Sequence, residues 1–176
     1  SKSFRNSKLI FIVEKDDFSI YNAWNQSLDF LDKLKIKKDS YVIFLGLDDI
    51  IHHNYLKKAS LTINKRNNID FLYGDYKCTL GDYYREYKSK SNPDIFKKNN
   101  FSFDIPHPGM INKWSSIKNY RFDESFKLAA DFDFYLRISV NNKINYVYLP
   151  IIQATLGAEG ISNSFKAKSI YLKEWK

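Results

Sequence analysis

The feature that most constrains the fold is a pair of short apolar runs separated by one stretch with helical spacing. The apolar runs at residues 9–13 and 41–45 have the length and composition of buried strands. Between them, residues 20–34 repeat apolar side chains at the spacing of an amphipathic helix. Because a strand, helix, strand unit usually forms neighbouring parallel strands through a right-handed crossover, this pattern predicts an α/β fold.

The rest of the chain adds antiparallel character to this prediction. A strand at residues 70–77 leads through a turn at 79–82, with Gly81 at its centre, into a second strand at 83–87. A strand is also expected at residues 144–149, and helices at 55–63, 130–140 and 165–175. The sequence therefore predicts a mixed sheet flanked by helices.

Composition limits the function classes that remain. The chain has 176 residues, enough for one domain, and its 44% hydrophobic and 27% charged residues are typical of a globular protein rather than a disordered or membrane-spanning one. The single cysteine, Cys78, cannot form an internal disulfide. A net charge of +8 attracts phosphate groups, but without a basic helix or an aromatic RNA motif we expect no nucleic-acid partner.

The strongest chemical signal is the adjacent pair Asp48 and Asp49, directly after the apolar run and Gly46. Ligands of α/β sheets bind beyond the carboxyl ends of strands, which is where these carboxylates are expected. Two neighbouring carboxylates are suited to Mg²⁺ or Mn²⁺, which bridges them to diphosphate oxygens. An equally good reading from spacing alone is that one aspartate caps the following helix while the other faces water.

Asp131 is the second candidate, at the start of the expected helix 130–140. Such a residue commonly serves as a helix N-cap. In a partly apolar cleft it would instead act as a general base, because burial raises the proton affinity of a carboxylate. Asp133 is the alternative for the same role.

His107 lies between two prolines, which fix the loop that carries its imidazole. His52 and His53 are adjacent, and neighbouring helical residues point in different directions, so they do not predict a joint metal site. The sequence has no zinc-binding cluster, glycine-rich P-loop or nucleophile elbow.

Several segments, taken in chain order, resemble the family 2 glycosyltransferases of the GT-A fold, particularly those that build bacterial surface polysaccharides. The most specific is the block FDESFKLAADFDFYLR at residues 122–137. The others are DFSIYNAWN at 17–25, FLGLDD at 44–49, DFLYGD at 70–75, PHPGM at 106–110 and GIS at 160–162. The resemblance implies one GT-A-like domain over residues 1–176 that is incomplete at its N-terminus and lacks the family's usual first strands.

The resemblance also implies roles for individual residues. Asp48 and Asp49 would hold Mn²⁺ or Mg²⁺, and Asp131 would be the catalytic base. A nucleotide-sugar donor would be contacted by three residues: Asp17, Asn25 and His107. The acceptor would be a saccharide or a lipid-linked saccharide, and the enzyme would work in the cytoplasm, with peripheral contact to the inner membrane. Two other functions fit the same residues: a metal-dependent nucleotidyl or phosphoryl transferase, and a noncatalytic module that binds glycans or anionic surfaces.

Overall fold

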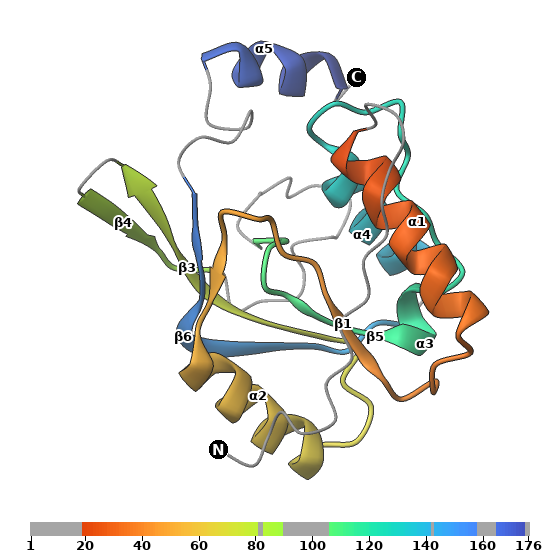
Figure 1. Ribbon diagram of the computed structural model, residues 1–176. Coiled ribbons are helices and arrows are strands. Elements are labelled where there is room, and N and C mark those ends of the chain that lie inside the picture. The colour runs from red at the N-terminus through yellow and green to blue at the C-terminus, as the bar shows by residue number, and fades with distance from the viewer. Residues whose placement is uncertain (1–18, 81–82, 90–105, 142, 158–164, 175–176) are drawn as a thin grey trace.

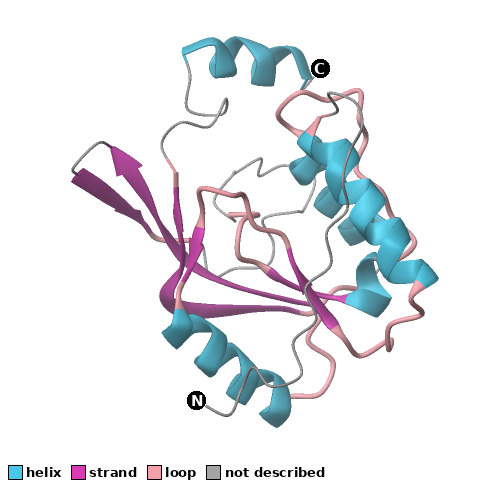
Figure 2. Cartoon of the chain, in the orientation of Figure 1, coloured by secondary structure: helices cyan, strands magenta, loops and turns pink. Residues whose placement is uncertain are grey.

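The computed structural model describes residues 19–80, 83–89, 106–141, 143–157 and 165–174. It shows a mixed α/β fold in which helices flank a curled six-stranded sheet (Figures 1 and 2). This confirms the expected fold class. The expected strand at residues 9–13 and the loop at 160–162 lie outside the described residues.

The helices are α1 (Ile20–Lys33), α2 (His53–Lys65), α3 (Trp114–Ile117), α4 (Ala130–Asn141) and α5 (Phe165–Glu174). The strands are β1 (Tyr41–Ile43), β2 (Ile50–Ile51), β3 (Phe71–Leu80), β4 (Tyr83–Tyr87), β5 (Ile111–Lys113) and β6 (Tyr146–Leu156). Four of the helices and four of the strands overlap the residues that the sequence patterns predict, whereas α3, β2 and β5 are missed. Those three elements are only two to four residues long, too short for a periodic pattern.

The sheet has the order β1-β5-β3-β6-β2, and β4 pairs with β3 beyond β5. Only β3 and β6 are parallel to each other among the described pairs, and the other pairs are antiparallel. Strand β3 is long enough to pair with β5 in its first half and with β4 in its second half. The second half and β4 form a hairpin that projects from the body of the sheet (Figure 1).

Side chains alternate between the two faces of β3, and each face supports a separate core. Phe71 and Tyr73 point into a core shared with α1, α3 and α4. Leu72 points to the opposite face, where Tyr55 and Ala59 of α2 cover the sheet. Each described core helix therefore covers one face of the sheet, as period-two alternation requires of a sheet buried on both sides.

Gly74 is required where β3 and β6 change register. A Cβ at this position would lie 2.4 Å from the carbonyl oxygen of Ile151, so a larger residue would displace the backbone. The Gly74 N–H donates to Oε1 of the fully buried Gln153 at 2.6 Å. The neighbouring Asp75 accepts hydrogen bonds from Ser89 N at 2.9 Å and from the Tyr148 hydroxyl at 2.8 Å. The Tyr-Gly-Asp segment thus fixes the centre of the sheet.

Within the described ranges, no helix has the length and apolar character needed to cross a membrane.

Candidate functional site

The acidic pair lies in the turn between β1 and β2. The Asp49 carboxylate accepts the Gly46 N–H at 2.9 Å through Oδ2, and the Gly157 N–H at 3.3 Å through Oδ1. Gly157 directly follows β6, so Asp49 joins the end of β1 to the end of β6. Asp49 is therefore held in place by two backbone amides.

Asp48 differs from its neighbour because its carboxylate is exposed and accepts no hydrogen bond within the part of the chain that the structure describes. Two glycines leave room for it. A Cβ on Gly157 would fall 1.9 Å from Asp48 Oδ2, and a Cβ on Gly46 would fall 3.2 Å from Asp48 Oδ1 and 2.9 Å from Asp49 Oδ2. Both carboxylates thus converge on the same glycine-lined floor, with Asp48 available to a ligand.

Neither aspartate caps the helix that follows. The N-cap of α2 is His52, whose side chain makes no capping hydrogen bond, and its Nε2 lies 2.9 Å from Thr155 Oγ1 instead. The reading in which one aspartate is a helix cap is therefore wrong.

The acidic pair fits a hard divalent cation in part. Asp48 and Asp49 supply two carboxylates of the type that Mg²⁺ and Mn²⁺ prefer. Among the described residues, however, no group of three or more His, Cys, Asp or Glu side chains is placed to hold a metal. Because Mg²⁺ normally keeps water and substrate oxygens in its coordination shell, two protein carboxylates are enough to hold it together with a diphosphate.

Asp131 lies in the first turn of α4, and its Oδ1 accepts the N–H of Phe132 at 2.8 Å. Desolvation of the carboxyl group raises the pKa of Asp131 to about 6, although the backbone hydrogen bond acts in the opposite direction. Asp133 is different because its Oδ2 forms an ion pair with Arg137 NH2 at 2.7 Å. The raised pKa of Asp131 suits a general base near neutral pH, whereas the Asp133 carboxylate is engaged by Arg137.

A third acid, which sequence patterns do not reveal, holds the backbone just before Asp131. Glu174, at the end of α5, accepts three consecutive backbone N–H groups: Lys127 at 2.6 Å, Leu128 at 3.1 Å and Ala129 at 3.0 Å. These donors lead into the N-terminus of α4, where a negative charge is favourable. The contact spans more than 40 positions in sequence, so no local signal announces it.

His107 is buried rather than exposed in a turn, with 4% of its surface accessible. Its ring lies among aromatic side chains, with the centroid of Trp24 at 4.5 Å and that of Phe44 at 5.1 Å. Nδ1 lies 3.0 Å from the Tyr135 hydroxyl, while Nε2 has no hydrogen-bond partner among the described residues. Burial lowers the pKa of His107 to about 3, so the imidazole is neutral at physiological pH.

The His107 loop connects the acidic turn to α4. On one side, Gly109 N donates to the Phe44 carbonyl at 3.0 Å, two residues before Gly46. On the other side, His107 contacts Tyr135, which stands one helical turn after Asp131. Burial is the main cause that raises the pKa of Tyr135, and the Asp131 carboxylate is the second. The His107 loop therefore contacts both Phe44, which leads from β1 into the acidic turn, and α4, the helix that carries Asp131.

The predicted donor contacts lie in different environments. Asn25 is buried. Its Nδ2 donates hydrogen bonds to Phe122 O at 2.9 Å and to Glu124 Oε1 at 2.8 Å, and its Oδ1 accepts one from Phe122 N at 2.8 Å. These bonds fasten α1 to the loop before α4, which is a structural role. Asp17 lies outside the described residues. Contact of Asn25, His107 or Asp17 with a donor stays a prediction.

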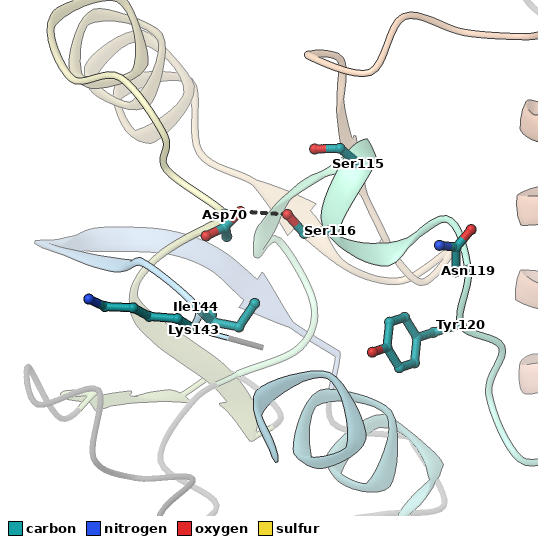
Figure 3. Close-up of a pocket in the computed structure, with 7 residues that line it drawn as sticks. All are labelled: Asp70, Ser115, Ser116, Asn119, Tyr120, Lys143 and Ile144. Carbon is teal, nitrogen blue, oxygen red and sulfur yellow. Dashed lines mark hydrogen bonds between the residues drawn. The ribbon is translucent and has the colours of Figure 1, made fainter. Parts of the chain in front are cut away.

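A separate polar hollow of about 510 Å³ opens at the other end of the sheet (Figure 3). Its walls come from the segments that enter β3 and β6 and from α3, whereas the acidic turn adjoins the end of β6. The lining residues are Asp70, Ser115, Ser116, Asn119, Tyr120, Lys143 and Ile144. Because α/β folds bind ligands at the carboxyl ends of their strands, the acidic turn is the better candidate for the functional site.

No family model matches the chain, and no curated protein matches it. Among solved structures, the chain is similar to residues 1–349 of TarS from S. aureus, a glycosyltransferase crystallised in complex with UDP. The TM-score is 0.57 and the identity 19%, over 82% of this chain and 42% of the TarS chain. The chain thus spans less than half of that structure, and at this identity the similarity shows a shared fold alone.

Proposed function

We propose that this protein transfers a sugar from a nucleotide-diphosphate donor to a hydroxyl group of a saccharide acceptor, with inversion, in the synthesis of a bacterial surface polysaccharide. One observation carries the proposal. Asp48, which is exposed and accepts no hydrogen bond from the described residues, and Asp131, whose pKa is raised, lie on segments that contact the same His107 loop, in a fold shared with a UDP-bound glycosyltransferase.

Asp48 and Asp49 would hold Mg²⁺ or Mn²⁺ against the diphosphate of the donor. The cation would supply positive charge that stabilises the departing nucleoside diphosphate, an effect typically of several kcal/mol. Asp49 contributes a fixed position, since two backbone amides hold its carboxylate. Asp48 contributes carboxylate oxygens that accept no hydrogen bond from the described residues and are therefore available to the cation.

Asp131 would act as the general base. Its carboxylate accepts the proton of the acceptor hydroxyl while the acceptor oxygen forms a bond to the anomeric carbon. The bond between that carbon and the diphosphate oxygen breaks on the opposite side, and the nucleoside diphosphate leaves with the electron pair. A pKa of about 6 suits this role because the group is mostly ionised at neutral pH and still holds a proton well.

In the same proposal, the nucleotide-sugar donor is contacted by Asp17, Asn25 and His107. His107 would contact the donor through Nε2, the nitrogen that has no partner among the described residues and that is buried in this structure. Asn25 would act from its fixed position on α1.

The test is a donor panel of UDP-, GDP- and dTDP-sugars, assayed with and without Mn²⁺ for nucleotide release and by mass spectrometry for products. We expect Mn²⁺-dependent release of a nucleoside diphosphate from at least one donor, and loss of that release in Asp48→Asn. Asp32→Asn, which removes an exposed carboxylate from α1, is the charge-matched control and should keep wild-type activity.

Two results would contradict the proposal. A product that gains phosphate or a nucleotide instead of a sugar would assign the acidic pair to phosphoryl or nucleotidyl transfer. Equal donor turnover in wild type and Asp48→Asn would remove the acidic pair from the reaction.

A further inference from the structure

The hairpin formed by β3 and β4 exposes an unusual amount of aromatic surface. Strand β4 pairs with β3 and with no other described strand. Tyr83 is 79% exposed and Tyr84 62% exposed, although tyrosine is a residue that proteins usually bury in large part. The hairpin extends beyond the body of the sheet (Figures 1 and 2), and residues 76–80 and 83–87 belong to neither core.

The strand register sorts the hairpin side chains into two faces. Directly paired residues of antiparallel strands point to the same side. Tyr76 pairs with Tyr87, Cys78 with Arg85 and Leu80 with Tyr83, so these residues, including the exposed Tyr83, share one face. On the opposite face, Lys77 pairs with Glu86 and Thr79 pairs with Tyr84.

The face that carries Tyr76, Arg85 and Tyr87, hereafter the tyrosine–arginine face, combines flat rings with a cation. The rings of Tyr76 and Tyr87 stack with centroids 4.9 Å apart and planes 7° apart. The Arg85 guanidinium lies 5.0 Å from the centroid of the Tyr87 ring. No carboxylate occurs among the described β3–β4 residues of this face, so the charge of Arg85 is not neutralised there.

The opposite face lacks this combination because its charges are already paired. Lys77 Nζ forms an ion pair with Glu86 Oε1 at 2.9 Å and lies 4.3 Å from the centroid of the Tyr84 ring. The two faces therefore differ in the chemistry they present to a ligand.

The tyrosine–arginine face is also close to the acidic turn. Leu156 of β6 pairs with Cys78 of β3, which pairs with Arg85 of β4, so these three residues form one row across the sheet. Two strand spacings separate the ends of this row, about 10 Å. The residue after Leu156 is Gly157, whose N–H binds Asp49.

A second observation supports this proximity. Burial is the main cause that raises the pKa of Cys78, and the negative charge of Asp49 is the second. The Asp49 carboxylate therefore lies within electrostatic range of Cys78, which is on the tyrosine–arginine face.

We propose that the tyrosine–arginine face binds the saccharide acceptor and directs its reacting end toward the acidic turn. The apolar faces of sugar rings stack on aromatic rings, and a guanidinium group donates hydrogen bonds to hydroxyl or carboxylate oxygens in a fixed planar geometry. A chain of sugars on Tyr87 and Arg85 would extend along the row that ends beside Gly157. This inference rests on the proposed sugar transfer for the reacting end, whereas the binding of glycan by the hairpin is independent of it.

The test compares the two faces of the same hairpin on an array of neutral and acidic bacterial oligosaccharides. Arg85→Gln removes the charge, and Tyr87→Leu removes the ring while keeping an apolar strand residue. Tyr84→Leu is the matched control, since it removes an exposed ring from the opposite face. We expect wild type and Tyr84→Leu to bind the same glycans, and Arg85→Gln and Tyr87→Leu to bind them at least about tenfold more weakly, as the loss of about 1.4 kcal/mol produces.

Asp48→Asn separates this inference from the proposed function. It should retain glycan binding even though it loses transfer, so a protein that binds glycans without transferring sugar would preserve the binding inference alone. Failure of wild type to bind any glycan on the array, or equal binding by Arg85→Gln, Tyr87→Leu and wild type, would overturn it.

A lipid surface is the alternative occupant, and vesicles test it. Binding to vesicles of phosphatidylglycerol and phosphatidylcholine that falls in Arg85→Gln, without Arg85-dependent glycan binding, would assign the face to a membrane and overturn the acceptor site. If Tyr87→Leu melts at a lower temperature than wild type, Arg85→Gln decides the result, because Arg85 is exposed and its replacement removes no core contact.

Discussion

Each end of the sheet carries an aspartate beside a strand, and the two aspartates differ in hydrogen bonding. At the start of β3, Asp70 accepts the Ser116 hydroxyl at 2.5 Å and the Asn145 N–H at 2.9 Å (Figure 3). At the other end, Asp48 is exposed above two glycines and has no hydrogen bond in the described part of the chain.

This contrast separates structural carboxylates from those available to ligands. A carboxylate whose oxygens are bonded within the protein stabilises the fold, and removing it leaves donors without partners. A carboxylate that the fold holds in place but does not bond is a candidate for an external ligand. The polar hollow at the Asp70 end is thus a structural junction, and the acidic turn is the candidate site.

The largest expected effect comes from Asp131. Asp131→Asn should lower the transfer rate by about 10²–10⁴-fold, because a positioned general base contributes that much. The wild-type rate should fall as the pH drops through about 6, when Asp131 becomes protonated. Steady-state kinetics from pH 5 to 8 with an identified donor measure both. A larger loss in Asp133→Asn would move the base to that residue.

The paired substitutions Asp48→Asn and Asp70→Ala test the comparison most evenly. Asp48→Asn should weaken Mn²⁺-dependent nucleotide binding by about tenfold or more and change the free energy of unfolding by less than about 0.5 kcal/mol. Asp70→Ala should lower the free energy of unfolding by about 1–3 kcal/mol, because Ser116 and Asn145 lose their acceptor, and leave nucleotide binding unchanged. Isothermal titration and urea denaturation give the two readouts. If Asp70→Ala weakened nucleotide binding and Asp48→Asn lowered the free energy of unfolding, the functional site would belong to the Asp70 end of the sheet.

Gly157→Ala should displace the Asp48 carboxylate by steric overlap, without changing any charge. Its Cβ would stand where Asp48 Oδ2 now lies, so the carboxylate must move away. We expect severalfold weaker Mn²⁺–UDP binding than wild type, measured by titration. Wild-type affinity in a folded Gly157→Ala variant would show that the position of Asp48 does not matter.

Burial of His107 should change the pH dependence of stability. His107 has a pKa of about 3 in the folded protein and a reference value of 6.5, so the unfolded chain binds a proton that the folded protein refuses. Its contribution to stability is present above pH 6.5 and is lost as the pH falls toward 3, at up to about 1.4 kcal/mol per pH unit. Urea unfolding between pH 7.5 and 4.5 should show a shallower loss in His107→Gln than in wild type.

Asp131 serves as a control, because its contribution to stability changes with pH in the opposite direction to that of His107. Because its folded pKa is raised to about 6, its favourable contribution is present below its unfolded pKa and is lost as the pH rises through about 6. Asp131→Asn should therefore be more stable than wild type at pH 8 and similar to it near pH 4. If Asp131→Asn differed from wild type by the same free energy of unfolding at every pH, burial of the ionised carboxylate would not be the cause of the difference.

Most of the fold follows from local patterns. The spacing of apolar residues predicts α1 and α4 nearly to the residue, and Gly81 with its alternating flanks predicts the β3–β4 hairpin. β5 is missed because three residues carry too little pattern, although it joins β1 to β3.

The candidate site is only partly visible in the sequence. Two aspartates after an apolar run predict the acidic turn, but the local pattern does not show that Gly157 holds Asp49 from 108 positions away. Glu174 and Gln153 act in the same way, through hydrogen bonds between segments distant in sequence. The burial of His107 is also invisible in the sequence, because four aromatic rings from four separate segments enclose it.

The most direct test is paramagnetic broadening of backbone NMR signals by Mn²⁺ in the presence of UDP, with Mg²⁺ as the diamagnetic reference. If one cavity joins the acidic turn to α4, the amides of Asp48, Gly157 and Asp131 should broaden together, while those of Asp70 and Lys143 stay sharp. Broadening around Asp70, or at Asp48 without any at Asp131, would contradict a shared site for the cation and the base.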